Sequence, residues 1–334
     1  MCRPWRPSPR RKITTTGMET ILATTGTHHP HPRPRRRAVL GLGVLAGLGA
    51  VGTVGPGTAY ASTATGAGLS RQLGELEREY SARLGVFARD TATGRTVAYR
   101  ADERFPLCSV FKTLAAGAVL RDLDRDGEYL AKRIHYTKEY AEAAGYSPIT
   151  GTAANVEAGM TVGELCSATV SHSDNGAGNL LLRELGGPTA ITRFCRSLGD
   201  RTTRLDRWEP ELNTAEPWRT TDTTTPRAIG GTYARLLLGR ALRDADRELL
   251  TDWLIANSTN VQRFRAGLPA DWTLADKTGG GAAYGVANDV GVVWPPGRPP
   301  LVLSVLSTKY DPAGPTDNPL VARAAGLVAG TLTA

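Results

Sequence analysis

The sequence predicts an α/β protein whose sheet layer is built from both ends of the chain, with a helical domain inserted between them. Two segments near the start and three near the end have the patterns of strands. Helical patterns dominate the region between them, to about residue 256. The chain has 334 residues, 41% of them hydrophobic, which is enough for a sizeable core.

The first predicted elements are a helix and a β-hairpin. An apolar stripe recurs at three- and four-residue steps, as on one face of a helix: Leu69, Leu73, Leu76, Tyr80 and Leu84. Residues 86–90 and 96–100 are predicted strands, and the Thr93-Gly94 pair between them is a turn signal. We therefore expect the two strands to pair as a hairpin.

Helices are predicted in the middle of the chain, and strands return at its end. Helical segments include 110–120, 177–185 and 233–254. Three strands are predicted at 273–277, 288–294 and 301–308, with Gly or Pro clusters between them. A final helix is expected over 319–332, so the two ends of the chain together supply one α/β layer.

The net charge of +8 belongs to the first 61 residues. They contain nine Lys or Arg residues and one acid, so the remainder carries 31 basic and 31 acidic side chains and is neutral. A neutral body lacks the positive field that binding to DNA or RNA requires. We therefore expect no nucleic-acid partner.

Residues 1–61 have the pattern of an export signal preceded by a dispensable extension. Three arginines at 35–37 precede an apolar run over 38–54, and Ala-Tyr-Ala at 59–61 offers a cleavage site. The adjacent arginines resemble a twin-arginine signal. We expect cleavage after about Ala61 and a secreted, monomeric product without membrane association. A transmembrane helix over the apolar run and a later start at Met18 remain as alternatives.

The residues that commonly bind metals are sparse after the export signal. Three cysteines remain there, which allows at most one disulfide, and no two of them have CxxC spacing: Cys108, Cys166 and Cys195. We expect them to be small buried apolar residues. His135 and His172 are the only histidines of this region and stand apart, so we expect neither a metal nor another cofactor.

Ser109 and Lys112 are separated by about one helical turn, at the start of a predicted helix. Their side chains share a face, with Cβ atoms about 5–6 Å apart. A serine is a poor nucleophile until a nearby base takes its proton, and a lysine at this spacing is placed to do so. Alone, S-x-x-K is a weak signal, because a capping serine near a surface lysine is the common case.

Two further triplets strengthen the interpretation. Ser173-Asp174-Asn175 precedes the apolar helix over 177–185, where Asp174 could simply cap the helix. Lys-Thr-Gly at 277–279 ends a predicted strand and is followed by two more glycines, so that a ligand can lie against the strand edge. Strand alternation points the lysine and the first glycine to one face and the threonine to the other.

S-x-x-K, S-D-N and K-T-G in this order resemble the signature of the penicillin-recognising serine enzymes. Residues 207–213, Arg-Trp-Glu-Pro-Glu-Leu-Asn, resemble the omega loop of the class A β-lactamases, and Asp222 matches the acid that pairs with the loop's arginine. The resemblance spans about residues 66–332.

The resemblance implies the β-lactamase/transpeptidase-like fold, an antiparallel five-stranded sheet flanked by helices. Residues 62–107 and 257–334 would form its α/β domain. Residues 108–256 would form an all-α domain that includes the omega loop at about 204–222.

The resemblance also implies hydrolysis of the β-lactam ring of penicillins, and of some cephalosporins, through a serine acyl-enzyme that gives antibiotic resistance. Ser109 would attack the ring carbonyl, and Lys112 and Glu209 are alternative bases for this step. Ser173 would relay a proton to the leaving nitrogen. The backbone N–H groups of Ser109 and Gly280 would form the oxyanion hole.

The omega-loop residues carry roles of their own by resemblance. Glu209 and Asn213 would position the hydrolytic water. Asn179 matches the residue that braces the loop from beneath, and Arg207 and Asp222 would be its buried ion pair.

Further matching residues would bind the substrate, a small-molecule β-lactam. Asn175 would hold the acylamide side chain of the drug. Lys277 and Thr278, with the serine of S-D-N, would bind its carboxylate, and Gly279 would complete the strand edge. Tyr146 matches an aromatic residue that walls the entrance.

The sequence departs from the commonest pattern of the family at the carboxylate site. Ala287 stands where many members have an arginine, and Arg263 falls where a subset of members places a substitute arginine. Arg265 would instead support the domain junction. In some members the residues at the positions of Cys108 and Cys166 form disulfides, but this chain lacks the partner cysteines. We therefore expect both to be free thiols.

Two other functions share parts of this pattern. A D-alanyl-D-alanine peptidase, or penicillin-binding protein, would share the serine, lysine and S-D-N residues but would lack Glu209 and Asn213 in this context. A β-lactam sensor domain would bind the drug covalently without turnover, and Glu209 argues against it as well. The sequence leaves open the spectrum of drugs, the susceptibility to inhibitors and the identity of the acylation base.

Overall fold

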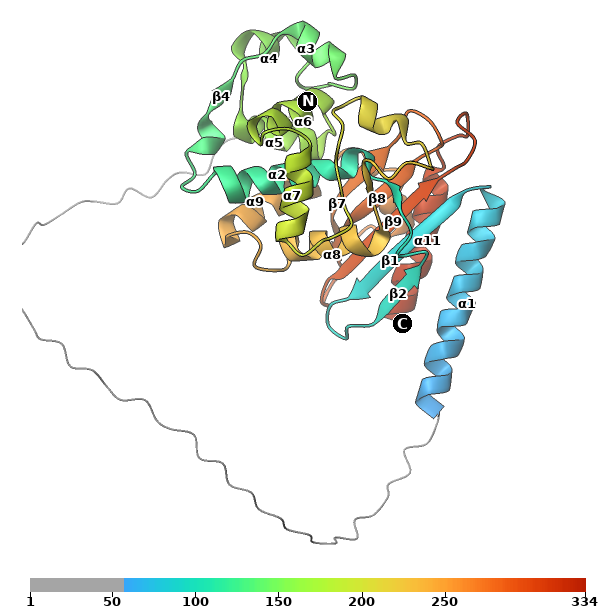
Figure 1. The fold of residues 1–334 in the computed structure, drawn as a ribbon. Helices are drawn as coiled ribbons and strands as arrows, with labels where there is room; N and C mark the ends of the chain where they lie inside the picture. Colours follow the sequence, from blue (N-terminus) through green and yellow to red (C-terminus); the bar gives the residue numbers. More distant parts are fainter. Residues whose placement is uncertain (1–56) are drawn as a thin grey trace, which may run out of the picture. The chain divides into compact units, whose positions relative to one another are not determined.

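The structure, a computed structural model, describes residues 57–334 (Figure 1). Most of the predicted export signal therefore lies outside the described residues, and its signal type stays a prediction. The first described element, helix α1 (Gly57–Glu79), begins ahead of the predicted cleavage point at Ala61. Within the described part of the chain, no helix is both long and apolar enough to cross a membrane.

A five-stranded antiparallel sheet forms the centre of the molecule, in the order β2-β1-β9-β8-β7. Its strands are β1 (Arg83–Asp90), β2 (Thr96–Tyr99), β7 (Thr273–Gly280), β8 (Ala287–Trp294) and β9 (Leu301–Thr308). The two ends of the chain meet where β1 pairs with β9 along eight residues. The predicted fold class is thereby confirmed, and the K-T-G strand β7 is an edge of the sheet.

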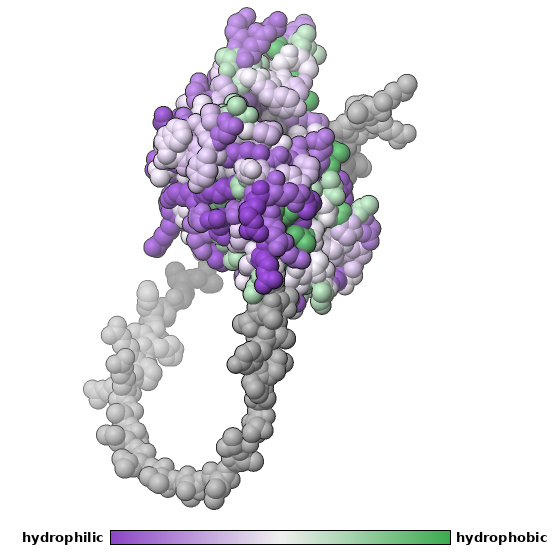
Figure 2. Space-filling view, turned by 90° about the vertical axis from the view of Figure 1, so that its right-hand side faces the viewer, coloured by the Kyte–Doolittle hydropathy of each residue, from purple (hydrophilic) through white to green (hydrophobic). Residues whose placement is uncertain are grey.

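Helices α1 and α11 (Asn318–Thr333) cover one face of the sheet (Figure 1). Leu69, Leu73 and Leu76 of α1 are buried against it, while intervening residues such as Arg71 are exposed. The predicted apolar stripe is wrong at its end, because α1 ends at Glu79 and Leu84 belongs to β1. On the face viewed in Figure 2, hydrophilic residues predominate and hydrophobic residues form only small separate patches.

Helices that lie between β2 and β7 in the sequence cover the other face of the sheet and build the larger core. They are η1 (Cys108–Val110), α2 (Phe111–Ala118), η2 (Val119–Leu123), η3 (Tyr129–Ala131), α3 (Lys138–Ala143), α4 (Ala153–Ala158), α5 (Val162–Ser171), α6 (Asn175–Glu184), α7 (Thr189–Ser197), η4 (Glu211–Thr214), α8 (Pro226–Leu237) and α9 (Asp244–Ile255). The short helix α10 (Phe264–Gly267), just before β7, is the exception, because its Phe264 packs into the core of α1 and α11.

The inserted region differs from the prediction in two details. Four two-residue strands pair there as β3 (Phe105–Pro106) with β6 (Thr223–Thr224) and β4 (Arg133–Ile134) with β5 (Met160–Thr161). The single helical pattern predicted over 233–254 is two helices, α8 and α9, since the chain turns between them at 238–243. The division into an α/β and a helical domain stays a prediction.

Cys108, Cys166 and Cys195 are buried free thiols, as expected. Burial raises the pKa of each thiol well above its ordinary value, because a thiolate would be poorly solvated there. No cluster of three or more His, Cys, Asp or Glu side chains suited to a metal ion occurs among residues 57–334.

Candidate active site

Ser109 lies in the 3₁₀ turn η1, which runs directly into helix α2. The residue before it, Cys108, has a φ of 43°, so the chain bends sharply as it enters the helix. Lys112 follows one turn later, and its Nζ donates a hydrogen bond of 3.0 Å to Ser109 Oγ. The turn thus places a hydroxyl and an amine within hydrogen-bond reach on one buried face.

Lys112 is completely buried and is held by four groups besides the serine hydroxyl. Its Nζ donates to Ser173 O (2.7 Å), more weakly to Ser173 Oγ (3.4 Å) and to Asn175 Oδ1 (2.5 Å), and lies 3.2 Å from Glu209 Oε1. Burial lowers the pKa of the ammonium group, and the Glu209 carboxylate opposes part of that shift. A lysine whose pKa is lowered by burial and partly restored by a carboxylate is suited to exchange a proton with the serine.

The S-D-N residues connect the nucleophile region to helix α6. Ser173 has a φ of 58°, which turns its hydroxyl and carbonyl toward Lys112. Asp174 caps α6 by accepting from Ala177 N (2.8 Å), as the capping alternative predicted. Asn175 Nδ2 donates to Ala144 O (2.9 Å), which leaves its second hydrogen available to a ligand.

Glu209 is held in place by amide side chains from two directions. Asn179 donates to Glu209 O (2.9 Å) and accepts from Glu209 N (3.0 Å). Asn213 Nδ2 donates to Glu209 Oε2. The other carboxylate oxygen, Oε1, is buried and accepts no hydrogen bond from any described group, although Lys112 lies beside it. A buried carboxylate oxygen whose one neighbour is this ammonium group has capacity left to accept from a water molecule.

The segment that carries Glu209 is closed by a hydrogen-bonded ion pair. Arg207 Nε donates to Asp222 Oδ2 over 2.6 Å, and Asp222 Oδ1 accepts from the backbone N–H groups of Asp206 (2.7 Å) and Arg207 (3.0 Å). Asp222 is buried, but a quarter of the Arg207 side chain is exposed. The predicted buried ion pair is thus buried at the aspartate and partly exposed at the arginine, which also contacts Thr214 and Glu216 at the surface of the loop.

The K-T-G residues face the nucleophile from the edge strand β7. A Cβ on Gly279 would lie 3.0 Å from Val110 Cγ2, so a larger residue there would push the strand and the nucleophile turn apart. Thr278 points the other way and bonds Thr259 through its hydroxyl (2.5 Å). Lys277 is completely buried, and burial together with the Lys112 charge lowers its pKa well below the ordinary value.

Arg263 lies beneath the end of this strand and is mostly buried. Its Nη1 donates to Gly279 O (2.7 Å) and Asn288 O (2.6 Å), and its Nε donates to Asn318 Oδ1 (2.7 Å). Nη2 makes no such bond among the described residues, and it lies 3.8 Å from where a Cβ on Gly280 would be. The guanidinium is therefore held by hydrogen bonds at Nε and Nη1, while Nη2 lies near the end of strand β7.

The remaining predicted site residues lie around this centre. Ala287 pairs with Gly280 across the sheet and is buried. Its methyl group carries no charge and so cannot bind a carboxylate as an arginine at this position would. Arg265 donates to Trp272 O (3.1 Å) beside the start of β7. Tyr146 is 61% exposed, and its carbonyl accepts from Asn175 N (2.8 Å), which ties the entrance residue to the S-D-N segment.

A pair of buried carboxyl groups behind the site has no sequence signal. Asp276 and Asp289 lie on neighbouring strands and are completely buried. One oxygen of each is bonded, to Asn260 Nδ2 (2.6 Å) and to Phe264 N (3.1 Å), while the other has no partner among the described groups. Burial and the neighbouring carboxylate raise the pKa of Asp289 well above 3.8, so we expect the pair to hold one proton between them.

This proton makes a testable contribution to stability. Because folding raises the pKa of Asp289, its contribution is fully present below about pH 3.8 and is lost as the pH rises toward the folded-state value. Asp289→Asn supplies a donor that does not titrate. We expect its melting temperature to exceed that of the parent at pH 8 by about 2–4 °C or more and to fall less with pH. The exposed variant Asp271→Asn is the control, and identical pH profiles for all three proteins would contradict the shared proton.

The geometry is that of an activated serine: a hydroxyl beside a buried lysine, which is in turn beside a buried carboxylate. The family model described as the β-lactamase enzyme family matches residues 68–332. The chain belongs to the β-lactamase enzyme family.

Individual relatives and solved structures agree with this assignment. The chain is 66% identical over 303 residues to a β-lactamase of Kitasatospora aureofaciens, covering 89% of this chain and 97% of the relative. It is 59% identical over 313 residues to a β-lactamase of Streptomyces albus G, covering 91% and 99%.

The structure of the β-lactamase from Streptomyces albus G superposes with a TM-score of 0.78 at 62% identity, covering 79% of this chain and 99% of that one. An ancestral class A β-lactamase superposes with a TM-score of 0.73 at 53% identity, covering 78% and 99%. The chain therefore has the class A fold.

Proposed function

We propose that the protein hydrolyses the β-lactam ring of penicillins, and of some cephalosporins, through an acyl-enzyme on Ser109, and so gives resistance to these antibiotics. The observation that carries the proposal is the buried Glu209 Oε1, which forms an ion pair of 3.2 Å with Lys112 Nζ and is bonded by no other described group. An enzyme that only forms the acyl adduct has no need of a second, water-orienting base.

In the first half of the reaction, Ser109 Oγ attacks the ring carbonyl while its proton passes to Lys112 or Glu209. The carbonyl oxygen becomes negative and is stabilised by the backbone N–H groups of Ser109 and Gly280. Collapse of this intermediate breaks the carbon–nitrogen bond, and Ser173 delivers a proton to the nitrogen. The contacts of Lys112 with both serines support this route.

In the second half, a water molecule attacks the ester carbonyl. Glu209 takes one proton of that water as the new carbon–oxygen bond forms. The ester bond then breaks, and the Ser109 oxygen recovers a proton, which frees the opened product. The hydrogen bond from Asn213 to Glu209 Oε2 supports this role, since it leaves the other oxygen for the water.

We propose that the substrate lies along the edge strand β7. Asn175 would donate its unused amide hydrogen to the acylamide group, and Tyr146 would form the wall of the entrance. Lys277 and Thr278 would bind the carboxylate of the drug, beside the narrow contact made by Gly279.

Arg263 is proposed as the substitute for the carboxylate-binding arginine, which would place the chain in the subset of the family that uses this position. Its free Nη2 near Gly280 supports this role, and so does the short side chain of Ala287. An arginine presents a planar pair of donors that suits a carboxylate.

Arg263→Ala is expected to lower kcat/KM for penicillins by about 10- to 100-fold, because a charge-assisted contact to the carboxylate is lost. Arg265→Lys, two residues along, is the control and should change kcat/KM less than about twofold. Steady-state kinetics together with melting curves make the comparison, since Arg263 also holds two backbone carbonyls. Equal and negligible effects of the two substitutions would refute the carboxylate role.

The proposed function is tested with a chromogenic cephalosporin in the presence of a chelator. Continuous turnover is expected, because none of the proposed steps requires a metal. A single stoichiometric burst without further turnover would instead favour a D-alanyl-D-alanine peptidase or a β-lactam sensor.

We further propose that the protein acts outside the cell as a monomer, exported by a twin-arginine-type signal that is cleaved after about Ala61. The basic residues confined to positions 1–61 and the neutral charge of the remainder support this. Mass spectrometry of the protein recovered from culture medium measures the cleavage point.

A further inference from the structure

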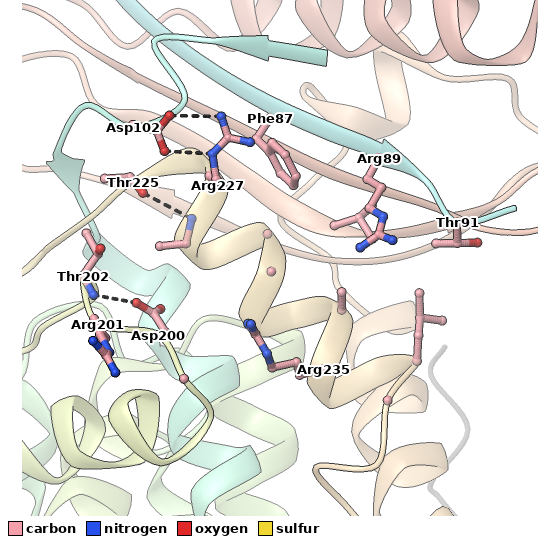
Figure 3. Close-up of a pocket in the computed structure, with 18 of the residues that line it drawn as sticks. Phe87, Arg89, Thr91, Asp102, Asp200, Arg201, Thr202, Thr225, Arg227 and Arg235 are labelled. Atoms are coloured by element: carbon pink, nitrogen blue, oxygen red, sulfur yellow. Dashed lines mark hydrogen bonds and ion pairs between the residues drawn. The ribbon is translucent and has the colours of Figure 1, made fainter. Parts of the chain in front are cut away.

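A groove of about 850 Å³ lies on the molecule between helix α8, strands β1 and β9 and the loop at 199–202 (Figure 3). None of the residues that line it belongs to the Ser109 site. Its lining includes four arginines, which come from β1, the loop and α8: Arg89, Arg201, Arg227 and Arg235. A concave surface with an excess of one sign of charge concentrates oppositely charged ligands.

Three of these arginines have no counter-ion among the described residues. Arg89, Arg201 and Arg235 are exposed, and within residues 57–334 none of their side chains makes an ion pair or hydrogen bond. Figure 3 shows Arg89 projecting from β1 toward α8, the helix that carries Arg235, with Arg201 on the neighbouring loop. Like charges gathered in one groove repel each other unless an anion is supplied.

The two carboxylates of the groove are already engaged. Asp102 binds Arg227 through two parallel hydrogen bonds of 2.8 and 3.0 Å. Asp200 is buried and accepts from Thr202 N (2.8 Å), from the backbone and hydroxyl of Thr203, and from the Thr232 hydroxyl (3.0 Å). The unpartnered arginines therefore leave the groove with an excess of positive charge.

The surroundings of the groove are ordered by packing. Gly230 lets α8 approach the sheet, since a Cβ there would lie 3.1 Å from Phe87 Cδ1. A Cβ on Gly231 would lie 3.3 Å from Arg235 Nη1, so the guanidinium rests over this glycine beside the groove. Thr225 caps the start of α8 by accepting from Ala228 N. The arginines are thus presented from fixed backbone positions.

We propose that this groove binds a compound carrying two or more phosphate groups. The guanidinium group is planar, always charged and able to donate two parallel hydrogen bonds to phosphate oxygens. Three such groups on separate segments suit an anion with several phosphates better than a single ion. The proposal goes beyond β-lactam hydrolysis and does not depend on it.

The test uses inorganic tripolyphosphate as the probe, titrated calorimetrically into the full-length protein at low and at physiological salt. Arg89→Gln, Arg201→Gln and Arg235→Gln are each expected to weaken binding about tenfold, since each removes a charged donor. Arg71→Gln, an exposed arginine of α1 away from the groove, is the control and should bind as the parent does. Binding should weaken with salt, as expected for exposed charges.

A second arm separates the two sources of phosphate. Vesicles of phosphatidylcholine with and without cardiolipin, a lipid with two phosphate groups, are sedimented with the parent protein and the variants. If the protein binds tripolyphosphate but does not sediment with vesicles, the ligand is a free phosphate compound. If it sediments with the anionic vesicles and tripolyphosphate releases it, the ligand is a lipid headgroup. In both cases the groove variants must lose the binding that the parent shows. Failure of tripolyphosphate to bind at low salt, or equal binding by the groove variants and Arg71→Gln, overturns the proposal. Hydrolysis of the chromogenic cephalosporin, measured in parallel, should be unchanged in all four variants.

Discussion

Replacing Glu209 with alanine is expected to stop the proposed reaction halfway, with the substrate attached to Ser109. The change removes the only carboxylate that lies beside Lys112 within hydrogen-bond reach among the described residues. Because a general base contributes about 10²- to 10⁴-fold, deacylation should slow by at least that factor. Intact-protein mass spectrometry after mixing with a penicillin should show the added mass of the drug, and digestion should place it on the peptide containing Ser109.

Glu211→Ala is the matched control, since it removes an exposed carboxylate of the same loop two residues away. This variant should turn over normally and accumulate no adduct. Normal turnover by Glu209→Ala would show that another group activates the water. Failure of Glu209→Ala to form any adduct would instead assign Glu209 to the acylation step, and so would decide between it and Lys112 as the first base.

Ser109→Ala is expected to abolish covalent attachment altogether. Removing the nucleophile of a serine hydrolase lowers kcat by on the order of 10⁶-fold, and no other hydroxyl bonds directly to Lys112 Nζ at 3.0 Å or less among the described residues. Hydrolysis of a chromogenic cephalosporin should fall to the background rate, and no mass increase should appear with penicillin.

The fold must survive this substitution for the result to be informative. Ser109 lies in a short turn, and no described hydrogen bond besides that from Lys112 involves its hydroxyl, so the melting temperature should change by no more than a few degrees. A residual activity within about tenfold of the parent, in a protein that melts normally, would mean that the nucleophile is another residue.

Local patterns predicted much of the fold. The Thr93-Gly94 turn signal corresponds to a hairpin between β1 and β2, and Gly94 has a φ of 73° that glycine adopts without strain. The three strands at the end of the chain begin within one residue of their predicted starts. Boundaries failed where tertiary packing competes with local preference, as at the end of α1 and in the turn that separates α8 from α9.

The candidate site was predictable to a smaller extent. Ser109 and Lys112 are one helical turn apart, so their proximity follows from helix geometry alone. Glu209 reaches the same lysine from nearly one hundred residues away, and only the resemblance to a known family indicated it. The Asp276–Asp289 pair and the arginine groove had no sequence signal, because their members are isolated residues on different strands and loops.

The opening prediction, an α/β layer built from both chain ends, needed only periodicity and turn residues, since those properties depend on neighbours a few positions apart. The chemistry needed the folded chain. Burial lowers the pKa of Lys112, and folding places Glu209 Oε1 beside that lysine and Arg263 beside Gly280. Each of these effects depends on water being excluded by segments distant in sequence, and no local pattern records which segments those are.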